Sequence, residues 1–249
     1  MLNIGNSHTQ VGLLKADSLE YIGTFSTDLW LSNSRRQLPE MVQPYADLHC
    51  VAACVVPKVH HQLSQWFGAN KLVMVSPETA VKIDFSKVDA ATLGADRIAN
   101  AAGAIALKLA PAVIIDCGTA ITLEVIDSQN RFLGGGIMPG RALQRRALHS
   151  HTAQLPYTPL TLECIPGPGR NTEDAIRFGI DTGLLGAVQR LVDECRDAGS
   201  EAYNIICTGG DAPFFCQSLR CLQPAPRFLT LHGAAAVASL HSLTGRPGR

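Results

Sequence analysis

The chain has 249 residues and a mass of 26.6 kDa, with 46% hydrophobic and 17% charged residues. This composition excludes a disordered chain and a fibrous repeat, and it supplies enough apolar material for one large domain or two small ones. Lys plus Arg number 21, as do Asp plus Glu, so the net charge is zero. A neutral chain lacks the electrostatic footprint of a nucleic-acid-binding or membrane-surface protein, and we expect neither partner.

The eight cysteines are not paired in C-x-x-C motifs, and most lie in apolar surroundings. Such residues behave as small hydrophobic side chains, which predicts reduced thiols and a cytoplasmic location. No basic segment before an apolar run indicates a signal peptide. Lys108 and Asp116 interrupt the best apolar stretch before it reaches the ~18 residues of a membrane span.

The first part of the chain alternates predicted strands and helices. Apolar and β-branched runs predict strands at Met1–Leu14, which contains a Gly-Asn turn, at Leu48–Val56 and at Leu72–Val75. Helices are predicted at Val59–Trp66 and, from its Ala and Leu content, at Leu93–Leu109.

The rest of the chain continues this alternation. Strands are predicted at Ala112–Val125, Arg131–Met138, Ala202–Cys207 and Leu229–Leu231. Helices are predicted at Arg141–His149, Asn171–Ala198 (continuous or broken near Gly183), Pro213–Leu222 and Gly233–Leu243. The Pro- and Gly-rich stretch Leu155–Arg170 is predicted as a loop. Alternating strands and helices indicate the α/β class.

One short pattern occurs twice. Asn3-Ile4-Gly5-Asn6-Ser7 and Asp116-Cys117-Gly118-Thr119-Ala120 share a polar residue, a glycine two positions later and small or polar residues after it. The two glycines are 113 residues apart. Either the echo is chance or the chain consists of two similar halves, each beginning with a glycine turn between strands.

A glycine turn between strands is a candidate phosphate-binding element. Its backbone N–H groups are expected to be free, and glycine lets a ligand approach closely. An ordinary β-turn explains one such loop equally well. The same two interpretations apply to Gly134-Gly135-Gly136 and to Thr208-Gly209-Gly210.

Two carboxylates are candidates for a chemical role. Asp96, in Gly94-Ala95-Asp96-Arg97, is either a helix cap or a general base, and Arg97 would then position an anionic group. Asp116 lies inside an apolar strand, where a buried carboxylate needs a partner such as a cation. The chain contains neither the G-x-S-x-G motif of a serine hydrolase nor a P-loop.

Taken together, these motifs resemble those of type III pantothenate kinases, in order along nearly the whole chain. The matching segments are Leu2–Ser7 (D-x-G-N-[TS]), Val55–Pro57 (V-V-P), Leu93–Asn100 (L-G-A-D-R-x-A-N), Asp116–Thr122 (D-x-G-T-A-x-T), Gly135–Gly140 (G-G-x-I-x-P-G), Thr152–Pro156 (T-A-x-L-P), Asn171–Gly179 (N-T-x-x-A-I-x-x-G) and Thr208–Ala212 (T-G-G-D-A).

The resemblance implies an α/β fold of two RNase H-like (actin-like ATPase) halves, residues 1–110 and 111–249, with the active-site cleft between them. It also implies ATP-dependent phosphorylation of pantothenate, the first step of coenzyme A synthesis. ATP, Mg²⁺ or another divalent cation, and a monovalent cation (K⁺ or NH₄⁺) would be required. A homodimer is expected, with the pantothenate pocket completed near the interface.

Individual roles follow from the same resemblance. Asp96 would be the base that takes the proton of the pantothenate hydroxyl, and Asp116 would bind the monovalent cation. The substrate pocket would comprise Gly94, Ala95, Asp96, Arg97 and Thr172. ATP would be held by Thr119 and by the loop Asn3, Ile4, Gly5, Asn6, Ser7, His8, Thr9 and Gln10.

The chain departs from the family pattern mainly at the ATP end. Asn3 replaces an Asp that helps to hold Mg²⁺, and Gln10 replaces a Lys. Lys87 stands at a position that is often aromatic, and Glu124 stands where Asp is more usual. Two alternatives to the kinase are therefore a non-enzymatic protein that binds pantothenate or nucleotide as a regulator, and a sibling kinase with another acceptor.

Overall fold

The computed structural model describes residues 1–16, 18–32, 38–68, 70–198 and 201–241. The chain divides into two compact units. Unit 1 comprises Met1–Ala110, Asn130–Leu133 and Phe228–Arg249, and unit 2 comprises Pro111–Gln129 and Gly134–Arg227.

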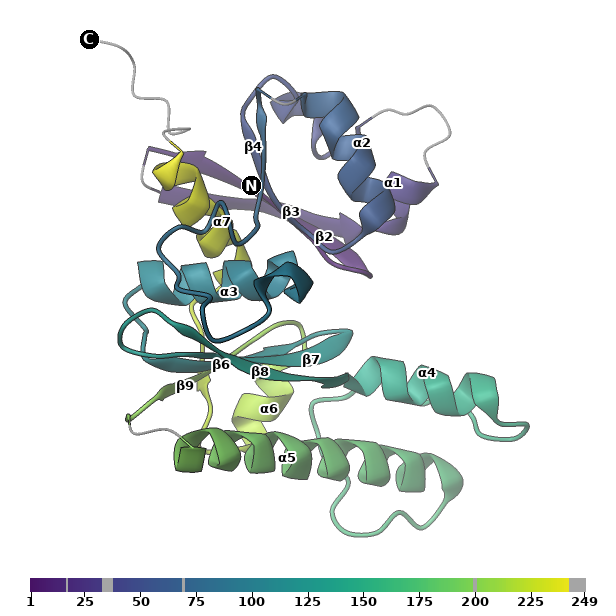
Figure 1. The fold of residues 1–249 in the computed structure, drawn as a ribbon. Coiled ribbons are helices and arrows are strands. Elements are labelled where there is room, and N and C mark those ends of the chain that lie inside the picture. The colour runs from purple at the N-terminus through teal and green to yellow at the C-terminus, as the bar shows by residue number, and fades with distance from the viewer. Residues whose placement is uncertain (17, 33–37, 69, 199–200, 242–249) are drawn as a thin grey trace. The chain divides into compact units, whose positions relative to one another are not determined.

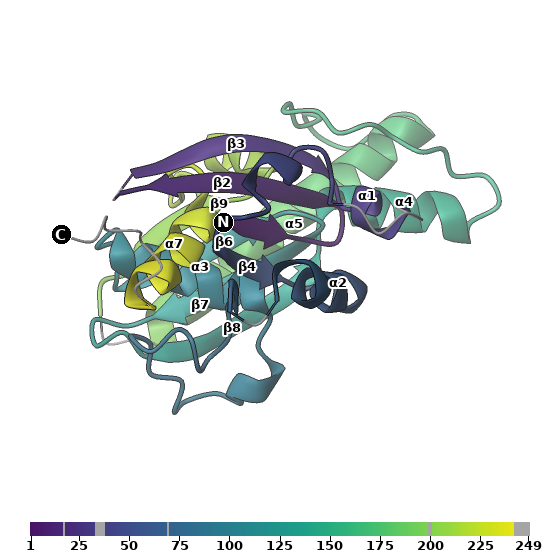
Figure 2. The same cartoon turned by 90° about the horizontal axis from the view of Figure 1, so that it is seen from above.

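Unit 1 is built on a mixed five-stranded sheet in the order β3-β2-β1-β4-β5 (Figures 1 and 2). The strands are β1 (Leu2–Ile4), β2 (His8–Lys15), β3 (Ser18–Ser26), β4 (Cys50–Cys54) and β5 (Leu72–Met74). The first three strands are antiparallel, whereas β4 and β5 run parallel to β1. The short central strand β1 therefore has one antiparallel and one parallel neighbour.

Helices cover both faces of this sheet. They are α1 (Asp28–Leu31), α2 (Pro57–Phe67), α3 (Ala95–Ala106) and α7 (Leu229–Leu240), together with the 3₁₀ turns Gln43–Tyr45 and Ala90–Thr92. Cys50 and Ala52 of β4 pack with α1 and α2, whereas α3 and α7 contact β4 on its other face. Because successive strand residues point to opposite faces, β4 is apolar at every position.

Unit 2 repeats this sheet. Its order is β10-β9-β6-β7-β8, with β6 (Ala112–Cys117), β7 (Ala120–Ile126), β8 (Phe132–Pro139), β9 (Asn204–Thr208) and β10 (Gln223–Pro224). The central strand β6 again has an antiparallel hairpin partner, β7, and a parallel partner, β9. The two sheets share one topology, which supports the interpretation of the sequence echo as a structural repeat.

The helices of unit 2 are α4 (Arg141–His151), α5 (Thr172–Ala198) and α6 (Ala212–Ser218). Along α5, residues four apart face the sheet and are buried, beginning with Ile176, Ile180 and Leu184. They pack on alternate residues of β6 and β7 together with Phe214 and Phe215 of α6. Figure 1 shows α5 running along this layer.

Several expectations from the sequence need correction. Leu229–Leu231 is the first turn of α7 and not a strand, since a short apolar run fits a buried helix as well as a strand. α5 continues through Gly183 without a break. Phe228–Arg249 groups with unit 1, although residues 111–249 were expected to form one half, because α7 packs on α3. Leu243 lies outside the described residues.

Within the described residues, no helix is both long enough and apolar enough to span a membrane.

Candidate active site

The first glycine loop, Gly5-Asn6-Ser7, connects the central strand β1 to β2. Contrary to the expectation from the sequence, the amide of Gly5 is not free, because it donates to the carbonyl oxygen of His8 at 3.0 Å. Thr27, at the start of α1, holds this loop through two hydrogen bonds. Its hydroxyl donates to the Gly5 carbonyl (2.8 Å), and its amide donates to the Ser7 carbonyl (3.0 Å). Sequence analysis missed Thr27, which no local pattern distinguishes.

Not every residue of this segment presents its side chain to a ligand. Ile4 is fully buried in the core of unit 1. Thr9 is also fully buried, and its hydroxyl accepts from Trp30 Nε1 (2.9 Å) and bonds Thr27 Oγ1 (3.1 Å). Asn6 and His8 are exposed. Ile4 and Thr9 therefore stabilise the loop from the core and do not present their side chains to a ligand.

Asn3 and Gln10, two of the departures from the family pattern, are direct partners. They face each other in the register of β1 and β2, and Asn3 Nδ2 donates to Gln10 Oε1 at 3.1 Å. This bond directs the Asn3 amide nitrogen toward Gln10. A neutral amide pair thus occupies the position where the family pattern has Asp and Lys.

The segment Gly94-Ala95-Asp96-Arg97 forms the N-terminus of α3, with Gly94 as the N-cap residue. Asp96 Oδ1 accepts from the backbone N–H of Arg97 at 2.8 Å. A Cβ atom on Gly94 would lie 2.6 Å from this oxygen, so glycine leaves room for the carboxylate. Asp96 is therefore not the N-cap residue; it lies in the first helical turn, close to the helix end.

The environment of Asp96 changes its acidity. Burial raises the pKa of its carboxyl group, and the hydrogen bond from the Arg97 amide together with the Arg97 charge only partly opposes this shift. A carboxylate that holds a proton more strongly than a solvated one is a better general base.

Aromatic rings support Arg97. Its guanidinium carbon lies 5.6 Å from the centroid of Phe132, which is fully buried and whose ring centroid lies 6.0 Å from that of Phe85, with the two rings tilted by 33°. Lys87, at the position that is often aromatic in the family, is exposed. Sequence analysis missed Phe85 and Phe132 because their proximity depends on pairing of Asp84 with residues 130–132.

The second glycine loop, in unit 2, links β6 to β7. The Gly118 amide donates to the Ala120 carbonyl (3.0 Å), so it too is internally bonded, and the Thr119 carbonyl accepts from Gly140 (2.9 Å). Asp116 is half-buried near the end of β6, opposite Thr122 and Thr208. Asp116 therefore lies next to the turns that adjoin these strands.

A third turn, Thr208–Asp211, closes on Asp116. Gly209 has φ of 93°, and an added Cβ atom would lie 2.5 Å from Asp116 Oδ1, so both conformation and space require glycine. The Asp211 amide donates to the Cys117 carbonyl at 2.9 Å. The turns at residues 116–119 and 208–211, both noted in the sequence, thus form one cluster.

Thr172 lies elsewhere on unit 2, at the first residue of α5, and is exposed. It lines a mainly apolar groove of about 420 Å³ between α4 and α5. The other lining residues are Leu148, Leu155, Ala175, Ile176, Gly179 and Ile180.

The described residues contain no group of three or more His, Cys, Asp or Glu side chains placed to hold a metal ion. Of the predicted cation ligands, Asn3 offers a neutral oxygen and Asp116 a carboxylate. At Asn3, a single neutral oxygen fits a divalent cation that is carried by the phosphates of a nucleotide better than one held by the chain alone.

A family profile described as type III pantothenate kinase matches residues 1–194. The chain belongs to the type III pantothenate kinase family. Curated type III pantothenate kinases agree over nearly full length. That of Paracoccus denitrificans is 30% identical over 93% of both chains, and that of Methylacidiphilum infernorum is 29% identical over 96% of this chain and 88% of its own.

Solved structures support the type III pantothenate kinase fold. A conserved Baf family protein from Campylobacter jejuni superposes with a TM-score of 0.62 at 21% identity, covering 97% of this chain and 98% of its own. At this identity the likeness shows the fold alone. It confirms the expected fold class, an α/β chain with two RNase H-like halves.

Proposed function

We propose that this pantothenate kinase uses Asp96 as the base that accepts the proton of the pantothenate hydroxyl during phosphoryl transfer from ATP. The product is 4'-phosphopantothenate, and the reaction is the first step of coenzyme A biosynthesis. The reaction itself follows from membership of the family. The observation that supports the role of Asp96 is its half-buried carboxylate at the start of α3, with a raised pKa.

We propose Gly94, Ala95, Asp96, Arg97 and Thr172 as the residues that bind pantothenate. Pantothenate carries a carboxylate, for which an arginine is the natural partner. The cation–π contact with Phe132 limits the conformations of Arg97 and favours one direction of its guanidinium group.

The ATP end is proposed to comprise the Asn3–Gln10 segment and Thr119, with a monovalent cation, K⁺ or NH₄⁺, at Asp116. Asn3 would contact the water shell of Mg²⁺ through its amide oxygen, because its amide nitrogen is bonded to Gln10. When bound, Mg²⁺ neutralises charge on the transferred phosphoryl group. The protein's own contribution is to position the reactants.

We further propose that the enzyme is a cytoplasmic homodimer and that a second copy covers the groove between α4 and α5. The support is local chemistry. Large apolar residues of α4 and of the segment between α4 and α5 are exposed, including Leu143 (37%), Tyr157 (46%) and Leu162 (56%). Thr172, a proposed substrate residue, lines the same groove. A covered groove would therefore bring the partner chain close to bound pantothenate.

The direct test is to incubate purified protein with ATP, Mg²⁺, K⁺ and pantothenate and to look for phosphopantothenate by mass spectrometry. We expect product, and we expect none when pantothenate is omitted. If neither the wild type nor the Asn3→Asp/Gln10→Lys double variant forms product, the kinase assignment is wrong. Calorimetry with pantothenate alone would then test the regulatory binding protein, which no observation so far favours.

A further inference from the structure

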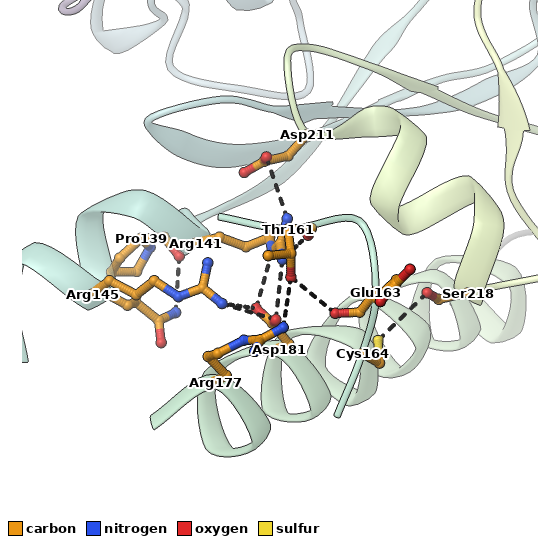
Figure 3. Close-up of polar contacts among 11 residues, drawn as sticks. Pro139, Arg141, Arg145, Thr161, Glu163, Cys164, Arg177, Asp181, Asp211 and Ser218 are labelled. Atoms are coloured by element: carbon orange, nitrogen blue, oxygen red, sulfur yellow. Dashed lines mark hydrogen bonds and ion pairs between the residues drawn. The ribbon is translucent and has the colours of Figure 1, made fainter. Parts of the chain in front are cut away.

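Unit 2 contains a buried ion cluster that the proposed chemistry does not use (Figure 3). Arg141 and Arg145 lie one turn apart on α4 and Asp181 lies in α5, and all three residues are 1% exposed. Arg141 binds both Asp181 oxygens, through Nε (3.0 Å) and Nη2 (3.1 Å). Arg145 Nη2 binds the same two oxygens at 3.0 and 2.9 Å. One carboxylate therefore holds two guanidinium groups.

The two arginines differ in their remaining contacts. Arg141 Nη1 lies 3.5 Å from Asp211 Oδ1, and its guanidinium group lies 3.5 Å above the ring of Phe214. Arg141 Nη2 also donates to the Thr161 carbonyl at 2.8 Å. Arg145 Nε and Nη1 have no hydrogen-bond partner among the described residues. Within the described residues, the ion pair that connects the cluster to Asp211 is formed by Arg141.

Arg141 is also tied to the proposed nucleotide loop through its backbone. It directly follows Gly140, whose amide donates to the Thr119 carbonyl. A Cβ atom on Gly140 would lie 2.2 Å from the Gly118 carbonyl oxygen, so these backbones are in close contact. Asp211, at the other end of the ion pair, donates its amide to the Cys117 carbonyl. Arg141 thus links the 208–211 turn and the 116–119 loop.

We propose that Arg141 is a positioning residue for the kinase: through Asp211 it holds the Thr208–Asp211 turn against the Asp116–Thr119 loop, and so it fixes the loop that binds ATP. The inference rests on the ATP role proposed for Thr119 and on the cation role proposed for Asp116. Stability alone does not account for the cluster, because well-packed apolar residues often replace a buried ion pair without loss of stability. A directional contact to a loop needs the rigid fork of arginine.

The test compares Arg141→Met with Arg145→Met. Each variant leaves Asp181 with one arginine, so both should melt below wild type, and Arg141→Met more so because it also loses the contacts with Thr161 and Phe214. Only Arg141→Met should raise the KM for ATP, by about tenfold or more, because misplaced phosphate contacts weaken nucleotide binding. The KM for pantothenate should remain within about twofold of wild type in both variants. Equal effects of the two variants on the KM for ATP would overturn the proposal.

Asp211→Ala covers the case in which Arg141→Met does not fold. It removes the contact at a side chain that is 17% exposed and leaves Asp181 with both arginines. The KM for ATP should rise as in Arg141→Met, and the Arg141→Met/Asp211→Ala double variant should be no worse than the more impaired single variant. An unchanged KM for ATP in folded Asp211→Ala would exclude the positioning role. If the wild type makes no phosphopantothenate, the proposed function is wrong, whatever the variants do. Direct ATP binding by calorimetry then still distinguishes the variants.

Discussion

Asp96 combines three local features that a general base needs. The N-cap glycine leaves room for its carboxylate, the Arg97 amide fixes one oxygen, and burial raises its pKa. The remaining oxygen is then available to accept a proton. All three features concern the carboxylate of a residue in the first helical turn and not an N-cap side chain, so we expect Asp96 to contribute more to chemistry than to capping.

Asp96→Asn should reduce kcat by about 10²–10⁴-fold, because asparagine cannot accept the hydroxyl proton. The melting temperature should hardly change, since the amide oxygen of asparagine can still accept from Arg97. Steady-state kinetics and thermal melting measure the two quantities. A clear fall in melting temperature with activity retained would instead identify Asp96 as a structural residue.

The raised pKa of Asp96 also predicts the acid side of the pH profile. A base must be deprotonated, so kcat/KM for pantothenate should fall as the pH drops through the pKa of Asp96. Because burial raises that pKa, the fall should begin above the ordinary carboxyl value of about 3.9. A profile flat down to the ordinary carboxyl range would contradict the assignment.

The Asn3–Gln10 pair, part of the proposed ATP end, is electrically neutral. Asn3→Asp should strengthen Mg-ATP binding by about 1–3 kcal/mol, since a charged hydrogen-bond acceptor replaces a neutral one. Adding Gln10→Lys should restore a partner for the new carboxylate. Calorimetric titration with Mg-ATP measures the gain, and the KM for pantothenate is the control.

The same substitution has an opposite effect without ligand. A half-buried carboxylate with no bound metal costs stability, so apo Asn3→Asp should melt below wild type and recover with Mg-ATP. Unchanged Mg-ATP affinity in both the single and the double variant would show that Asn3 does not face the metal.

At the scale of elements, the closest packing is between α3 and α7. A Cβ atom on Gly233 would lie 1.8 Å from the Ala99 carbonyl oxygen, and one on Gly103 would lie 2.5 Å from the Leu229 carbonyl oxygen. The two helix backbones therefore touch, and a buried hydrogen bond from Thr230 to Asn100 (2.8 Å) crosses beside them. Since α3 begins with the Asp96 segment, α7 supports the substrate end.

Gly233→Ala should destabilise unit 1 by about 1–3 kcal/mol, because the added methyl group forces the two helices apart. Gly186→Ala in α5 is the matched control. An added Cβ atom there meets nothing within 4 Å, so alanine should be neutral or stabilising by up to ~1 kcal/mol. Chemical denaturation of both variants gives the comparison, and equal stability would contradict the close packing.

At the scale of the whole molecule, the chain repeats one sheet topology twice. Each central strand, β1 or β6, leads into a glycine turn, and the residues two positions before these glycines are Asn3 and Asp116. The repeat explains why two distant segments carry similar motifs. It also shows that the two segments differ in charge two positions before the glycine, where one has the neutral Asn3 and the other the acidic Asp116.

The proposed homodimer gives the prediction at this scale. Gly179→Glu should convert the protein to monomers, because the substitution is sterically free in one chain but places a charge in the apolar groove. Gln217→Glu, at an exposed position of α6, is the control and should leave the dimer intact. Sedimentation at micromolar concentration measures both. A monomeric wild type would contradict the dimer.

Sequence alone predicted the α/β class, most elements and the family motifs, because strand and helix periodicity and glycine turns are local signals. β3, α1 and β10 were missed, since their segments carry weak local patterns. Ordered motifs also pointed to pantothenate phosphorylation before any contact was known.

Tertiary structure decided the features that depend on distant partners. Thr27 reaches the first loop across 22 residues, Phe132 supports Arg97 across 35, and Asp181 binds Arg141 across 40. It also showed that Asn3 and Gln10 form a pair and that the glycine amides of both loops are bonded internally. Local propensity acts between neighbours in the chain, whereas burial and hydrogen bonding act between neighbours in space, and only the folded chain determines those.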